Sequence, residues 1–386
     1  MSMISRFAPF LMLTAAAPTA LPAAPMPVAD SAPSAAFFYT LRAADLRLAT
    51  IAYRLTTANA ALCDRLQPQI GMPIHALTQY GPGARKAATA TFGFESTIGV
   101  EAVVAGGPAD RAGVRPNDSI VAIDDRPQPG LPSADAPESA AARDAAEAVI
   151  TEAPVGKPLR LTVLRDGKRL PITITPMTGC RSRFEILLGS GLDASADGAI
   201  VQLGERFFEG YTDEEIAVVV AHELSHNILR HRARLDAAKI NRGLLAELGR
   251  NGRLIRQTED QADLLGIYLL ANAGYDPMSA PKFWRSKGGA FDGGLFRSRT
   301  HASSKARAEA LEAAARDGAR GQRNGTFRVA TTGGMIGRVE VAAMSRAAAS
   351  SASARALEEA CVRLRNSPPS IAPPLLRQNL GADIGS

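Results

Sequence analysis

The sequence contains few cysteines, few aromatic residues and very few histidines. Among 386 residues there are 3 Cys, 1 Trp and 5 His, and aromatic residues make up only 5%. Three cysteines allow at most one internal disulfide, which excludes a small domain held together mainly by cross-links. Hydrophobic residues reach 46%, so the chain can build real cores, and its length suggests two domains.

No apolar run in the sequence is long enough to cross a membrane. Residues 7–17 are apolar, follow Arg6 and lead into small residues and prolines up to about Val28. A transmembrane helix needs about 20 apolar residues, whereas a short run of this kind is typical of a secretory signal. We therefore predict a signal peptide over residues 1–28, cleaved between Ala20 and Ala29, and an exported, periplasmic or otherwise extracytoplasmic protein. A disordered Ala/Pro-rich tail is the alternative.

Charge of one sign is also not concentrated anywhere. The 44 basic and 38 acidic residues are interspersed, and they leave a net charge of +6 without a basic arm. This pattern argues against a nucleic-acid partner. Scattered arginines from Arg297 to Arg328 leave association with a membrane surface open, although such residues are more often simply solvated.

Export would place the three cysteines in an oxidising compartment, where a disulfide can form. We expect Cys63 to pair with Cys180, because both lie at the ends of segments that flank one predicted domain. The two pairings that involve Cys361, and three reduced thiols, remain alternatives.

The region before the first predicted domain is helical. Apolar residues recur at helical spacing from Leu41 to Leu66, so we predict an amphipathic helix within residues 39–70, docked on a domain through its apolar face. Residues 72–86 contain Gly, Pro and His75, and they favour a connector in which His75 is a surface or turn residue without a functional role.

Short β-strands are predicted between residues 90 and 178. Ile98–Val104 and Ser119–Ile123 are rich in β-branched residues, and the Asp166–Gly167 pair between two further apolar runs predicts a hairpin. Helices are expected before Gly113 and over residues 133–150.

The segment Gly107–Ile120 reads GPADRAGVRPNDSI and resembles the central signature of bacterial PDZ domains, with Asn117 where that family usually has Gly. The resemblance implies a module that captures the C-terminal carboxylate of an extended peptide on backbone N–H groups. By the same resemblance, Phe92, Gly93 and Phe94 match the carboxylate-binding loop. A simple turn at Gly93 in a spacer module is the alternative.

A metal site is indicated on the helix that follows Tyr211. Thr212 and Glu215 have the spacing of a capping box, and an apolar face then continues along the segment. His222 and His226 follow at i and i+4 on one face, so their ring nitrogens can converge on one metal ion. Glu223 stands beside the first histidine, where its carboxylate can reach a water molecule at the metal. We read His231 as a surface residue or as a support to the pair.

A catalytic zinc needs a third protein ligand. The predicted helix 259–271 presents Glu259 and Asp263 one turn apart, within a segment too apolar for a solvated face. We assign Glu259 as the third ligand of a single zinc ion and Asp263 as the acceptor that orients a ligating histidine.

These motifs together resemble the HtpX and BepA type of zinc metallopeptidase, relatives of the CAAX prenyl endopeptidase. The match runs from Asp193 to Arg307, and the family usually has Asn where Asp193 stands. The resemblance implies that the strand over residues 199–203 lines the cleft and pairs with extended substrate. It also implies that His301 and Arg307 lie near the zinc, where they stabilise the oxyanion or where His301 blocks the open position. The proline that the family has after the histidine is Ala302 here.

The sequence therefore predicts an α+β fold with a mostly helical, zincin-type metalloprotease domain, a small edge sheet and a β-rich PDZ-like domain. The expected function is zinc-dependent endopeptidase activity on exported proteins, with a chaperone-like protein that binds clients without cutting them as the alternative. The oligomeric state stays open. The expected order is a signal peptide (1–28), an amphipathic helix (39–70), a PDZ-like domain (90–178), a metalloprotease domain (185–320) and a tail (321–386) with one helix at 353–364.

Overall fold

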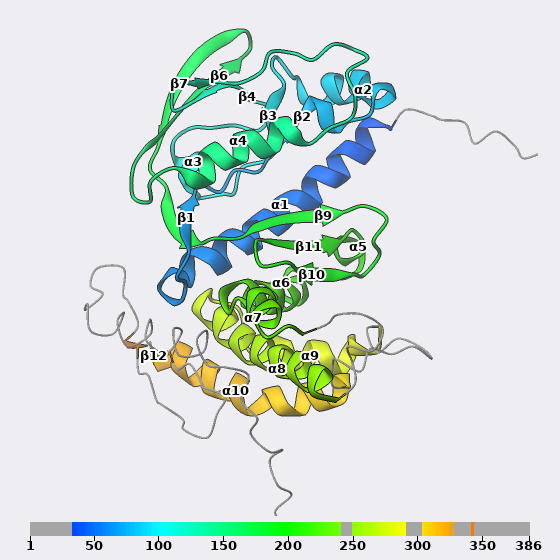
Figure 1. Cartoon of the computed structure of the whole chain (residues 1–386). Coiled ribbons are helices and arrows are strands. Elements are labelled where there is room, and N and C mark those ends of the chain that lie inside the picture. The colour runs from blue at the N-terminus through cyan, green and yellow to red at the C-terminus, as the bar shows by residue number, and fades with distance from the viewer. Residues whose placement is uncertain (1–32, 241–248, 291–302, 325, 328–340, 343–386) are drawn as a thin grey trace, which may run out of the picture. The chain divides into compact units, whose positions relative to one another are not determined.

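The structure is a computed structural model that describes residues 33–240, 249–290, 303–324, 326–327 and 341–342 (Figure 1). The predicted signal peptide, Cys361 and the predicted helix at 353–364 lie outside the described residues. Within them the fold is α+β, as predicted, with helices and several separate sheets. Among the described helices, none combines the length and the hydrophobicity that crossing a bilayer requires.

The described part of the chain contains both helices and strands. The helices are α1 (Ala35–Ala58), α2 (Pro82–Phe92), α3 (Pro108–Arg111), α4 (Ala141–Glu152), α5 (Phe207–Gly210), α6 (Asp213–Ile228), α7 (His231–Ala237), α8 (Gly249–Asn272), α9 (Ser279–Ser286) and α10 (Ser304–Asn324), with 3₁₀ turns η1 (Ala60–Leu62), η2 (Leu77–Gln79) and η3 (Gly288–Ala290). The strands are β1 (Leu66–Gln69), β2 (Ile74–Ala76), β3 (Ile98–Val100), β4 (Ser119–Ile123), β5 (Arg126–Pro127), β6 (Leu159–Arg165), β7 (Lys168–Ile174), β8 (Met177–Cys180), β9 (Arg183–Leu187), β10 (Ala194–Ala196), β11 (Ile200–Gly204), β12 (Thr326–Phe327) and β13 (Val341–Ala342).

The predicted amphipathic helix exists as α1, but its predicted bounds of 39–70 are wrong. The helix begins at Ala35, where the Ser34 hydroxyl accepts the N–H of Phe37, and it ends at Ala58. Residues 66–69 form β1, which pairs with β8. The apolar periodicity predicts too late an end for the helix, because Leu62 lies in a 3₁₀ turn after the helix has ended. Leu62 is 1% exposed and packs in the same core as Leu55 of the helix.

The apolar face of α1 docks on the helical domain, as expected. Leu48, Ile51 and Leu55 belong to one core with residues of α6, α8, α9 and α10. Burying an aliphatic side chain of this size stabilises a fold by about 1.5–3 kcal/mol. Arg47 adds a polar anchor, since its Nε lies 2.6 Å from the Asp213 carboxylate at the start of α6. The predicted domain 185–320 therefore leaves out a helix that belongs to its core.

The PDZ-like domain is built on a sheet of six strands in the order β2-β3-β4-β6-β7, with β5 paired to β4. The predicted hairpin joins β6 and β7, and both turn residues have positive φ, 53° at Asp166 and 71° at Gly167, as a tight hairpin turn requires. The predicted start at residue 90 is wrong, because residues 72–86, which we expected to be a connector, contain β2 and the first part of α2. His75, expected at the surface or in a turn, lies on β2 and is 3% exposed. A three-residue strand is too short to show a period.

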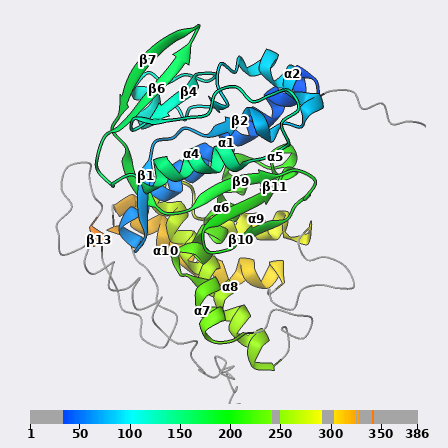
Figure 2. The same ribbon diagram turned by 45° about the horizontal axis from the view of Figure 1, so that its top comes forward.

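The helical domain pairs α6 with α8 and places a three-stranded sheet beside α6, as both views show (Figures 1 and 2). The strand order is β10-β11-β9, so β11 is hydrogen-bonded on both sides and β10 lies at an edge. We expected residues 199–203 to pair with substrate. That expectation is wrong, because β11 already pairs with β10 on one side and with β9 on the other.

The predicted disulfide is confirmed. Cys63 and Cys180 are bonded, with their Cα atoms 5.4 Å apart and a sequence separation of 117. Cys63 follows η1 and Cys180 ends β8, so the bond joins the connection after α1 to the strand that leaves the PDZ-like domain. Both ends of that domain are thereby held at one place.

Two carboxyl groups meet where α1 contacts the PDZ-like domain. Burial raises the pKa of Asp45 to about 6, although a hydrogen bond from Glu101 partly opposes the shift. Burial and the neighbouring Asp45 also raise the pKa of Glu101. The hydrogen bond between the two side chains lowers the pKa of Asp45 and raises that of Glu101, so Glu101 donates and Asp45 accepts, in the field of Arg42 and Arg143.

This pair predicts a pH-dependent stability. The pKa of Asp45 is higher in the folded chain than the value of about 3.9 in an unfolded chain. Its contribution to the free energy of unfolding is therefore fully present below pH 4 and is lost as the pH rises through 6. A shift of this size corresponds to at most about 3 kcal/mol. In urea unfolding at several pH values, the stability of the wild type relative to Asp45→Asn should fall by up to that amount between pH 4 and pH 7. Parallel pH profiles for the two proteins would contradict the assignment.

Candidate metal centre

The centre begins with the first turn of α6. The Thr212 hydroxyl accepts the N–H of Glu215 at 3.3 Å, and the Glu215 carboxylate accepts the N–H of Thr212 at 2.9 Å. The predicted capping box is thus confirmed, and it fixes where the helix starts. From that start, His222 and His226 fall one turn apart, with ring centroids separated by 4.9 Å.

The second helix, α8, contributes the acidic groups. It begins at residue 249, ten residues before the predicted start, and packs along α6. Glu259 and Asp263 are one turn apart on it, so both carboxylates reach the same side of α6. The structure thereby brings together the residues that the sequence assigned as ligands.

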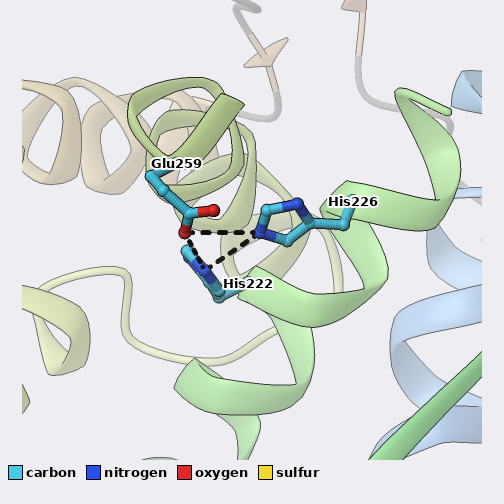
Figure 3. Close-up of side chains that lie close together, drawn as sticks. All are labelled: His222, His226 and Glu259. Carbon is cyan, nitrogen blue, oxygen red and sulfur yellow. Dashed lines mark hydrogen bonds and ion pairs between the residues drawn. The ribbon is translucent and has the colours of Figure 1, made fainter. Parts of the chain in front are cut away.

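Three donor atoms converge at this place, as Figure 3 shows. The Nε2 atoms of His222 and His226 are 3.2 Å apart, and Glu259 Oε2 lies 3.3 Å from the first and 3.6 Å from the second. Donors about 2.0–2.1 Å from a tetrahedral zinc lie about 3.3 Å from one another. The set of two imidazoles and one carboxylate also suits zinc chemically. Among the described residues, this is the group of His, Cys, Asp and Glu placed to hold a metal ion.

Asp263 lies behind His222, as predicted. Its Oδ1 is 2.8 Å from His222 Nδ1, which leaves Nε2 directed to the other two donors. Burial opposes charge on Asp263, but Arg307 and His222 outweigh it and lower the pKa of Asp263 to about 2. Burial would lower the pKa of His222, but hydrogen bonds to Asp263 and Glu259 raise it to about 10. A metal must displace that proton, so binding should weaken as the pH falls.

Arg307 lies close to the converging donors, as the family resemblance implied, because its Nη2 is 3.4 Å from Nδ1 of His222. Its Nε donates to Asp263 Oδ2 at 2.7 Å, and its guanidinium lies 3.4 Å from the centroid of the Trp284 ring. Only 8% of the residue is exposed. Arg307 therefore pairs with Asp263 beside His222, and its role as an oxyanion partner stays a prediction. His301, its predicted companion, lies outside the described residues.

His231 is not a surface residue, contrary to the first of its two predicted readings. It is 2% exposed, and its Nδ1 lies 2.9 Å from Nδ1 of His226. Its other nitrogen lies 3.1 Å from Oε1 of Gln261, a residue that no sequence motif marks. The spacing of five residues after His226 gave no signal, because the contact depends on the turn between α6 and α7. Glu223 is half-buried on α6 beside His222.

The predicted carboxylate-binding loop at residues 92–94 is contradicted. Phe92 ends α2, and the Gly93 N–H is bonded to the Thr89 carbonyl at 2.8 Å, so it cannot bind an anion there. Phe92 and Phe94 are buried and pack with Phe38 of α1. The aromatic side chains therefore build a small core at the end of α1.

A cavity of about 160 Å³ marks a different place in the PDZ-like domain. The segment before the edge strand β2 and the helix α4 form two of its walls, while α1 and β9 supply the others. Gly71 lies in that first wall with a φ of 68°, and a Cβ there would come within 3.2 Å of the Val104 Cβ. Six of the residues that line the cavity are Ala49, Ile70, Gly71, Met72, Ile74 and Ile150.

Comparisons with known proteins support a PDZ domain and a distant relationship to a metalloendopeptidase. A family model described as PDZ domain matches residues 99–130, so the chain contains a PDZ domain. Mitochondrial metalloendopeptidase OMA1 of Schizosaccharomyces pombe is 28% identical over 207 residues, which are 45% of this chain and 60% of that protein. The chain is thus a distant relative of a metalloendopeptidase and spans well under two thirds of its length.

Two solved structures share a similar region. HtrA-type protease AlgW with decapeptide is 23% identical, with a TM-score of 0.22, over 29% of this chain and 30% of that one. The HtrA3 PDZ domain bound to a phage-derived ligand is 24% identical, with a TM-score of 0.22, over 30% of this chain and 89% of that one.

The buried ion pair behind His222 predicts a large cost for losing Arg307. Arg307→Met would leave the Asp263 carboxylate buried without its cation, which costs about 3–5 kcal/mol for such a pair. The control is Arg316→Met on the same helix, whose side chain is 61% exposed and pairs with Glu312 at 3.0 Å. That change should cost less than about 1 kcal/mol. Equal costs in urea unfolding at pH 7 would show that Arg307 does not compensate Asp263.

Proposed function

We propose that the chain is a zinc-dependent endopeptidase of the HtpX and BepA type, acting on exported proteins. The observation that carries the proposal is the convergence of His222 Nε2, His226 Nε2 and Glu259 Oε2 within 3.6 Å of one another. A zinc ion bound there supplies Lewis acidity toward the scissile carbonyl and lowers the pKa of a water molecule to about 7. The distant metalloendopeptidase relative agrees with this class of reaction.

The side chains of this protein divide the remaining work. Glu223, half-buried beside His222, is the general base that takes the proton of the attacking water and returns it to the leaving amine. Asp263 keeps His222 in the tautomer with its proton on Nδ1. The edge strand β10 lies next to α6, where an extended substrate can add to it as a further strand.

The PDZ domain is proposed to bind peptide C-termini at the cavity between β2 and α4. Glu101 N–H bonds to Pro73 O and Leu77 N–H bonds to Thr97 O, so these alternate positions of the β2 segment face β3. The backbone groups of Ile74 therefore face the open edge. An extended peptide can pair there, with an apolar C-terminal side chain in the cavity and its carboxylate near Gly71. The volume of about 160 Å³ suits one such side chain.

Export remains a proposal as well. Its support is the sequence of residues 1–28 together with the Cys63–Cys180 disulfide, because such bonds persist in oxidising compartments.

Two substitutions separate chemistry from metal binding. Glu223→Gln should keep one zinc per chain and lose at least about 100-fold in the rate of casein cleavage, because only the base is removed. Glu259→Ala should lose the bound zinc, because one of three ligands is gone. Zinc is measured by elemental analysis, and cleavage by release of soluble peptides.

The same assays also distinguish the enzyme from a chaperone-like protein that binds clients without cutting them. Undiminished cleavage by Glu223→Gln would remove Glu223 as the base, and full zinc content in Glu259→Ala would remove Glu259 as a ligand. If the wild type holds zinc but does not cleave casein, the chaperone-like reading or a block by His301 gains support. Cleavage by His301→Ala alone would then point to the block.

The peptide site predicts a preference for free C-termini. A peptide ending in an apolar residue should bind at least about tenfold more tightly than its amidated copy in fluorescence anisotropy, because backbone N–H groups pair with the carboxylate. Ala49→Trp should weaken binding, because the indole fills the cavity. The control is Ala36→Trp, at an exposed position of the same helix. Equal affinity for the two peptides would exclude carboxylate capture.

A further inference from the structure

The contact between His226 and His231 depends on the turn that separates α6 from α7. Arg230 adopts a left-handed conformation with a φ of 55°, and α7 starts at the next residue. This turn folds His231 back against the helix that it has just left. The two rings meet at a centroid distance of 4.8 Å, close to perpendicular, with both Nδ1 atoms 2.9 Å apart.

The far side of His231 is also occupied. Its Nε2 lies 3.1 Å from Gln261 Oε1, and Arg234 Nη1 donates to the same oxygen at 3.0 Å. Gln261 stands on α8 between Glu259 and Asp263, so the contact returns to the helix that carries the third ligand.

The direction of each hydrogen bond follows from the one before it. A guanidinium can only donate, so Arg234 fixes the amide of Gln261 with its oxygen toward both partners. That oxygen accepts from Nε2 of His231, and a neutral imidazole that carries its proton on Nε2 has Nδ1 as an acceptor. His226 must then donate from Nδ1, and its Nε2 lone pair faces His222 and Glu259.

We propose that Arg234, Gln261 and His231 form a hydrogen-bond relay that holds His226 in the tautomer and orientation needed for metal binding. His231 is thus a positioning residue and does not touch the metal. The inference rests on the proposed zinc site. It adds that the two ligating histidines are supported differently, His222 by the Asp263 carboxylate and His226 by a neutral ring.

The test compares zinc binding by the full-length protein and by two matched variants. His231→Leu fills the space but offers no acceptor, whereas His231→Asn places an amide oxygen near the position of Nδ1. We expect His231→Leu to weaken zinc binding by about 10–100-fold in competition with a chromophoric chelator, and His231→Asn to stay within about threefold of the wild type. With Co²⁺ as the probe, the visible bands should change in His231→Leu and return in His231→Asn.

Two results for these variants would overturn the relay. Equal zinc affinity in wild type and His231→Leu would overturn the relay, and so would equal losses in both variants, since that result indicates packing alone. If His231→Leu does not fold, Gln261→Met tests the next bond and should weaken zinc binding in the same direction, while unchanged affinity would again overturn the relay. A wild type that binds neither Zn²⁺ nor Co²⁺ would overturn the metal site itself.

Discussion

The hydrogen bond between His222 and Asp263 ties α6 to α8 at the level of the converging donors. It is 2.8 Å long and buried, and the charge on Asp263 is maintained by Arg307 from a third helix, α10. A buried carboxylate without such a cation would be costly, so the packing of α6, α8 and α10 and the geometry of the centre depend on one another. The same packing places Glu259 one turn before Asp263, facing both histidines.

Helix α1 gives the molecule its second organising feature. Its middle belongs to the core of the helical domain, while Phe38 near its start packs with Phe92 and Phe94 of the PDZ domain. It also forms one wall of the cavity that we propose for peptide C-termini. A ligand in that cavity would therefore contact the helix that packs against α6, which gives peptide binding and the metal centre a shared structural element.

Much of the centre could be predicted from local sequence, because a helix places residues i and i+4 on one face whatever its surroundings. His222 and His226 follow from that rule, as do Glu259 and Asp263, whereas the capping box follows from the residue types at Thr212 and Glu215. Contacts set by tertiary packing could not be predicted. The ion pair between Arg307 and Asp263 was not predicted, and the loop expected at residues 92–94 forms part of an aromatic core instead. A strand as short as β2 shows no alternating pattern in the sequence, so neither β2 nor the Gly71 that precedes it was predicted.

The proposed function depends on one coordination sphere of two imidazoles and one carboxylate, supported by a carboxylate on one side and a neutral histidine on the other. X-ray absorption spectroscopy of the zinc-loaded protein tests this sphere directly. We expect four nitrogen or oxygen donors at about 2.0–2.1 Å, with the multiple-scattering signature of two imidazoles and no sulfur. A sulfur shell near 2.3 Å, or zinc without imidazole scattering, would contradict the proposed site.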